Sequence, residues 1–221
     1  MKAIKNTTLP SYDQKISTLF QILFLTLFVA ITAAIYFYPE PFLFWQHAFS
    51  NLGDRVSLAG YNNMISRIIY ISGIVTASIV LFQISAHYKQ PFKFQHQAIK
   101  QRLAAFSGTG FLISTPPNNL YPKIHSLGMT IAVGSLYLII MYLLFEQRAQ
   151  IPAWLFYIDI IILQVVLFSY AVGLIVCSIF KQTLQKLCFI SMTSFLLRAT
   201  SLTQENPAPD KILASSKRLP H

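Results

Sequence analysis

The chain has 221 residues, of which 54% are hydrophobic and only 11% are charged. Soluble domains carry about 25% charged residues, so this composition lacks the charge that coats a water-facing surface and indicates a membrane protein. Lysine and arginine together number 17 against 7 aspartates and glutamates, which gives a net charge of +10. Because basic residues are retained on the cytoplasmic side of membrane proteins, we interpret this excess as a topology signal and expect no nucleic-acid partner.

Three apolar segments in the first half of the chain are predicted to be membrane spans, each of which needs roughly 20 apolar residues. Residues 16–38 carry no charge and exceed the length of a signal-peptide hydrophobic region, so we expect an uncleaved span. The second segment, 64–87, has a single charge, Arg67. The third, 103–115, is short and ends at Pro116 and Pro117, which cannot donate to a helix.

Three further apolar segments follow. Residues 124–145 begin shortly after Pro122, which suits the first turn of a helix, and residues 153–180 are long enough to tilt. The sixth segment, 184–197, is short enough to be re-entrant or interfacial. The fifth contains Asp159, an intramembrane acid that is either functional or a protonated structural residue.

The basic residues favour six spans over five. With six spans and an inner N-terminus, most of the 17 basic residues fall on the cytoplasmic side, whereas five spans divide them evenly. We therefore predict an all-α integral membrane bundle of six transmembrane helices with both termini cytoplasmic. Residues 1–199 form its single domain, and residues 200–221 are predicted to be a polar, basic, disordered cytoplasmic tail.

Small residues on the third helix and polar residues on the second predict which helix faces pack closely and which carry a polar site. Ala104 and Gly108 have the small-xxx-small spacing that suits close packing between membrane helices. Asn63, Arg67 and Tyr70 recur at helical spacing, so they share one face of the second helix. Arg67 is either a structural residue that reaches loop carbonyls or lipid phosphate, or part of a functional site.

Two polar clusters are expected at the outer face of the membrane. The first follows the first span and the second lies between the third and fourth spans, so the six-span topology places both on one side. Because they are expected to converge, we interpret them as one outward-facing ligand site. The candidate ligand-binding residues are His47, Asn51, Arg55, Asn62, Asn63, Arg67, Asn118, Asn119 and Lys123.

The same clusters contain the residue types of nucleophilic catalysis. Ser50, His125 and Asp54 supply a hydroxyl, a base and a carboxylate that orients the base. The stretch from Ser50 to Asp54 is also typical of a structural turn, with Gly53 at a positive φ. Either Asn62 or Asn63 is expected to cap the second helix, which leaves the other unexplained.

Cysteines and histidines give no sign of a metal site. The five histidines contain no pair with the i, i+4 spacing of a helical metal site, and no CxxC motif occurs, so we expect no metal and no cofactor. Cys177 and Cys188 lie at similar depth in neighbouring segments. We interpret them as small buried core residues, although they are placed so that they can approach each other.

Several motifs resemble a known family. They are the stretch from Trp45 to Asp54, Asn62 and Asn63, and the stretch from Gly108 to Ser126. They resemble the six-span prokaryotic membrane proteins of domain-of-unknown-function family 998 and, more distantly, the Frag1/DRAM/Sfk1 group. The resemblance implies six helices, polar outer loops and a bacterial inner membrane, with no established reaction. Its usual acidic residue before His125 is replaced here by Asn118 and Asn119.

Three functions are consistent with the sequence. The first is a multi-pass inner (plasma) membrane protein whose outer pocket binds a lipid headgroup or similar amphiphile, with Arg67, Arg55 and Lys123 on its phosphate. The second is an intramembrane hydrolase or transferase that uses Ser50, His125 and Asp54. The third is a small transporter with Asp159 and Gln164 in its pathway, although the sequence lacks inverted repeats.

Overall fold

A computed structural model describes residues 12–88, 95–146, 148, 151–175 and 181–205. These residues are helical apart from the loops, and the only β pairing among them is an isolated bridge between Val56 and Asn62. Each of the six predicted segments falls on a helix. The elements are α1 (Tyr12–Tyr36), the short 3₁₀ helix η1 (Phe49–Gly53), α2 (Met64–Tyr88), α3 (Gln95–Ile113), α4 (Pro122–Glu146), α5 (Ala153–Ile175) and α6 (Lys181–Glu205).

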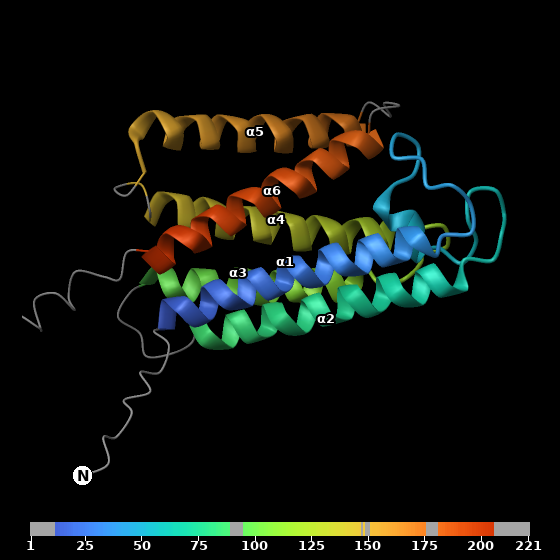
Figure 1. The fold of residues 1–221 in the computed structure, drawn as a ribbon, viewed down its shortest axis with the longest axis horizontal. Coiled ribbons are helices and arrows are strands. Elements are labelled where there is room, and N and C mark those ends of the chain that lie inside the picture. The colour runs from blue at the N-terminus through green and yellow to red at the C-terminus, as the bar shows by residue number, and fades with distance from the viewer. Residues whose placement is uncertain (1–11, 89–94, 147, 149–150, 176–180, 206–221) are drawn as a thin grey trace, which may run out of the picture.

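The helices form a bundle with two layers of unequal size (Figure 1). Helices α1 to α4 pack side by side in chain order, α6 crosses α1 and α4 obliquely, and α5 lies outermost against α6. The end of the bundle where α1 finishes and α2 begins carries residues 37–63 and 114–121, and we call it the loop end. The opposite end, where α1 begins and α6 finishes, is the terminal end.

The outside of the bundle is apolar. Three described helical segments are long and apolar enough to cross a membrane, and 153–165 is a shorter apolar stretch. Large aliphatic and aromatic side chains on the helices are exposed, which suits a lipid environment and is unusual for a water-facing surface. The protein is therefore a helical membrane protein. The three long segments are Gln14–Tyr36, Met64–Tyr88 and Pro122–Glu146.

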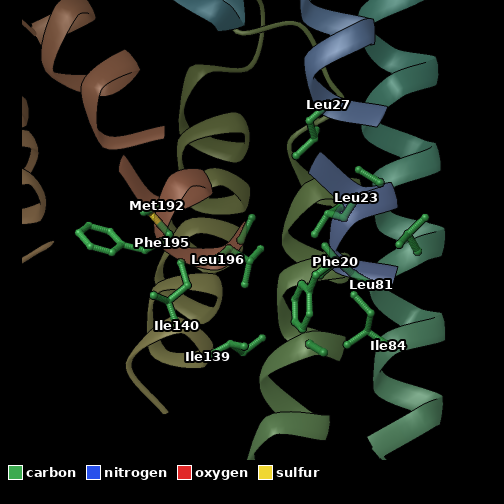
Figure 2. Close-up of a cluster of buried hydrophobic side chains, with 14 of the residues drawn as sticks. Phe20, Leu23, Leu27, Leu81, Ile84, Ile139, Ile140, Met192, Phe195 and Leu196 are labelled. Atoms are coloured by element: carbon green, nitrogen blue, oxygen red, sulfur yellow. The ribbon is translucent and has the colours of Figure 1, made fainter. Parts of the chain in front are cut away.

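The interior is also apolar. Figure 2 shows side chains of α1 and α2 gathered on one side and side chains of α4 and α6 on the other. Phe20, Leu81, Ile84 and Ile139 have no exposed surface. Since lipid is as apolar as this core, close van der Waals packing contributes more to helix association here than exclusion of water does.

Small residues bring α3 and α4 into backbone contact through Gly110, whereas Gly108 of the predicted pair packs against Ser78 and Phe82 of α2. A Cβ atom on Gly110 would lie 2.4 Å from the Ala132 nitrogen, and one on Gly128 would lie 2.5 Å from the Ser114 nitrogen. The Ser107 hydroxyl also donates to the Ala132 carbonyl across the same contact, at 2.9 Å. This close approach lets the loop between α3 and α4 reach the centre of the loop end.

α3 and α6 extend beyond the apolar segments that the sequence predicted. α3 begins at Gln95, and its buried Lys100 forms an ion pair with Glu146 of α4 at 2.7 Å. α6 extends past Arg198 to Glu205, so residues 200–205, which were assigned to the disordered tail, are helical. The last residues of the predicted fifth span, 176–180, and the rest of the tail lie outside the described residues.

Candidate functional site

The loop end is organised around Asn63, the residue before α2. Its side chain is 1% exposed, and its amide donates to the carbonyls of Asn51, Leu52 and Asp54 at 3.2, 3.1 and 3.0 Å. Helix capping falls to its neighbour Asn62, whose side-chain oxygen accepts the Met64 N–H at 3.1 Å. The Asn pair therefore has two roles, since Asn62 starts α2 and Asn63 fixes η1 against it.

Asp54 joins the two predicted polar clusters. Its carboxylate is 3% exposed and accepts the backbone N–H of Asn119 at 2.9 Å and the side-chain amide of Asn51 at 3.0 Å. The convergence of the two loops is thus confirmed. Among the described residues Asp54 forms no ion pair with Arg55 or Arg67.

His125, in the first turn of α4, is 5% exposed and held by its own loop. Its Nδ1 lies 3.3 Å from the Pro116 carbonyl, which can only accept, so Nδ1 carries the proton. No carboxylate of the described chain lies within ion-pair distance of the ring. In the neutral ring with its proton on Nδ1, Nε2 is an acceptor, and it is buried without a hydrogen-bond partner in the described structure.

An apolar cavity extends from the loop end into the bundle between α1, α4 and α6. Its empty volume is about 930 Å³ including the open space at its mouth, and about 80 Å³ of this accepts the centre of a water molecule. The smaller volume is the one that compares with the roughly 300 to 1,000 Å³ of small-molecule sites, so the enclosed part of the cavity is narrow. In Figure 2, Leu23 and Leu27 of α1 lie opposite Met192 and Leu196 of α6, and all four side chains line the cavity.

Most polar groups of the cavity lie toward the loop end. Ser50 of η1, His125 of α4 and Gln185 of α6 line it there, whereas Leu136 and Leu196 line it deeper in the bundle. Thr193 also lines the deeper part, where its hydroxyl donates to the Phe189 carbonyl of its own helix. The span from His125 to Leu136 covers roughly 16 Å of helix at about 1.5 Å per residue. The cavity thus has the shape of an amphiphile site, with an apolar length and a polar end.

The predicted triad is only partly assembled. Ser50 and His125 line the same cavity, but Nε2 has no hydrogen bond and is therefore not bonded to the Ser50 hydroxyl. The Pro116 carbonyl orients the imidazole in place of Asp54, whose oxygens both accept hydrogen bonds from other groups. Asp54 therefore positions the two loops and does not touch His125.

The predicted basic residues lie outside the cavity. Arg55 and Lys123 are exposed, and Arg67 is half-buried with its Nε lacking a hydrogen-bond partner among the described residues. None of the three lines the cavity. Of the predicted amides, Asn62 and Asn119 are exposed, whereas Asn51 and Asn118 are half-buried.

His47 belongs to a separate structural cluster in the first loop. Its Nδ1 accepts the Leu43 N–H at 2.7 Å, and its Nε2 lies 3.8 Å from a Glu40 oxygen. Burial lowers the pKa of His47, an effect that the Glu40 carboxylate opposes and the Lys186 ammonium reinforces. The predicted ligand-binding role is not matched by its position, because His47 does not line the cavity.

Lys186, near the start of α6, has no exposed surface. Its ammonium donates to the carbonyls of Phe44 and His47 and lies 4.4 Å from the centre of the Phe44 ring. It also lies 5.5 Å from the Phe42 ring and 5.6 Å from the Phe49 ring. Lys186 thus attaches α6 to the first loop. The aromatic residues of that loop were the only signal in the sequence that a cation would be held there.

The intramembrane acid lies apart from this site, whereas one cysteine lines it. Asp159 of α5 is buried, and the exposed Gln164 donates to the Tyr137 hydroxyl of α4, but neither residue lines the cavity. Cys188 is buried and lines the cavity, whereas Cys177 lies outside the described residues.

No group of three or more His, Cys, Asp or Glu side chains in the described chain is placed to hold a metal ion. The apolar lining from α6, including Met192, was not recognised in the sequence, because only the oblique crossing of α6 turns these residues toward α1.

Comparison with protein-family models, curated proteins and solved structures finds no match to this chain.

Proposed function

We propose that this protein is a six-span protein of the inner (plasma) membrane, with both termini cytoplasmic, that binds a membrane lipid or other amphiphile in the cavity. The alternating direction of the helices and the basic residues near the terminal end support this topology. The six-helix bundle with polar loops also fits the proposed relationship to family 998. In this topology the loop end, with Ser50 and His125, faces outward.

The observation that carries the binding proposal is the long apolar cavity whose polar groups other than Thr193, which bonds to its own helix, lie toward the loop end. An alkyl chain gains van der Waals contacts along Leu23, Leu27 and Leu196, while Ser50 and His125 meet its polar group. Ligand sites are generally of this kind, with apolar walls and a few convergent polar groups that fix orientation.

The two alternatives have less support. A hydrolase or transferase needs a base in contact with its nucleophile, and Nε2 of His125 is not hydrogen-bonded to Ser50. A transporter pathway through Asp159 and Gln164 lacks a cavity that joins them to the loop end among the described residues. Ligand binding requires neither feature.

Photocrosslinking tests the proposal. The protein is reconstituted in lipid nanodiscs with hexadecyl probes that carry a mid-chain diazirine and either a hydroxyl or a phosphate head. We expect at least one probe to label cavity-lining peptides. Met129→Trp, which fills the cavity, is expected to lower this labelling at least about tenfold, since the chain and the indole cannot occupy one volume.

Leu127→Trp is the matched control, because this exposed residue lies on the same helix and faces away from the cavity. It should label like the parent. Equal labelling of the Met129→Trp and Leu127→Trp variants would show that the chain binds elsewhere and would overturn the proposal.

A further inference from the structure

Among the described residues, no charged side chain lines the cavity where it could hold an ionic head group. The described lining contains no aspartate, glutamate, lysine or arginine, and its polar members include Ser50, Gln185 and Thr193. An anion placed in such surroundings loses hydration without gaining a counter-charge, which weakens its binding. The cavity therefore selects against a phosphate head.

The polar end offers a specific acceptor. In the neutral ring whose Nδ1 donates to Pro116, Nε2 presents a lone pair that no described group satisfies. A buried acceptor without a partner costs free energy, which a ligand recovers if it donates a hydrogen bond there. Ser50 lines the same end and its hydroxyl can accept or donate as the ligand requires.

We infer that the site selects an uncharged amphiphile whose polar end donates a hydrogen bond to Nε2 of His125. This inference rests on the proposed function. Long-chain alcohols and monoacylglycerols have this chemistry. An ether of the same chain length has an apolar part of similar size but no hydrogen to donate. A phosphate monoester adds a charge that the cavity does not match.

Competition against the hydroxyl-headed photoprobe tests this inference. The competitors are hexadecanol, hexadecyl methyl ether and hexadecyl phosphate, each added to the parent protein in nanodiscs. We expect hexadecanol to compete about tenfold better than the ether, the ratio that roughly one hydrogen bond to a buried acceptor provides. This comparison in the parent requires no variant to fold.

Two variants assign the effect to a residue. His125→Phe keeps an aromatic ring but removes the acceptor, so the preference for the alcohol over the ether should disappear. Arg67→Ala removes the half-buried guanidinium outside the cavity and should leave the preference unchanged. Retained preference in His125→Phe would overturn the assignment to Nε2.

The outcomes separate the inference from the proposed function. If labelling depends on Met129 but alcohol, ether and phosphate compete equally, the cavity binds chains and the inference fails. If hexadecyl phosphate competes best and this advantage is lost in Arg67→Ala, the site recognises phosphate and the inference is overturned. If labelling does not respond to Met129→Trp, both fail.

Discussion

A single buried asparagine organises the loop end. The Asn63 amide serves three carbonyls of the η1 segment, and through that segment it places Ser50 at the cavity. Asp54 extends the same network to Asn119 and thus to the loop that holds His125. At this scale the conspicuous polar residues of the sequence divide into those that position the loops and those that face the cavity.

Removing the Asn63 side chain should destabilise the protein. Asn63→Ala leaves buried carbonyls without a donor, so we expect the free energy of unfolding to fall by about 1 to 3 kcal/mol. Chemical denaturation in detergent micelles measures the change. Asn119→Ala is the control, because Asn119 is exposed and only its backbone N–H is used, and it should change stability by less than about 0.5 kcal/mol. Equal losses in the two variants would contradict the role assigned to Asn63.

Close contact between α3 and α4 is the decisive feature at the scale of elements. Gly110 and Gly128 bring the two backbones together, and this contact sets the position of the loop that carries Pro116. α6, in contrast, does not pack closely along its neighbours. It crosses α1 and α4 obliquely, and the cavity lies between these three helices. One tight contact and one open crossing therefore define the site.

Matched glycine substitutions test the tight contact. Gly110→Ala places a methyl group against backbone atoms that cannot move aside, so we expect a loss of about 1 to 3 kcal/mol. Gly134→Ala, in an open position of α4, should instead stabilise by up to about 1 kcal/mol through helix propensity. Thermal unfolding in the same detergent distinguishes the two signs. A stabilising Gly110→Ala substitution would show that α3 and α4 are not in backbone contact.

At the scale of the whole molecule, the six-span topology assigns most basic residues of the sequence to one side of the membrane. Near the terminal end, the Lys100 and Glu146 ion pair joins α3 to α4. Near the loop end, Arg55 and Lys123 are exposed, Arg67 is half-buried, and Lys186 is enclosed by carbonyls and aromatic rings. This distribution predicts the orientation of the bundle in the membrane.

Cysteine labelling tests the orientation. In a background with Cys177 and Cys188 replaced by alanine, single cysteines are introduced at Asn119 and Gln95, which lie at opposite ends of the bundle. On intact cells an impermeant maleimide should label Asn119→Cys, and Gln95→Cys should react only after permeabilisation. The reverse pattern would invert the topology and place the cavity mouth on the cytoplasmic side.

The sequence by itself determined the helical membrane class, the order of the helices and the presence of two polar loops at one end. These are local properties, because the length of an apolar run, a proline that stops a helix and a small-residue spacing are all readable from neighbouring residues. Even so, the extent of α6 was underestimated, because the apolar run stops before Arg198 whereas the helix continues to Glu205.

Only the tertiary structure decided the chemistry of the site. Ser50, Asp54 and His125 have the right residue types for a triad, but Asp54 pairs with Asn119 while His125 turns to Pro116. The cavity is likewise absent from any single segment, because it depends on the angle at which α6 crosses α1 and α4. Hydrogen-bond partners and cavities depend on distances between segments far apart in the chain, and residue identities alone do not specify these distances.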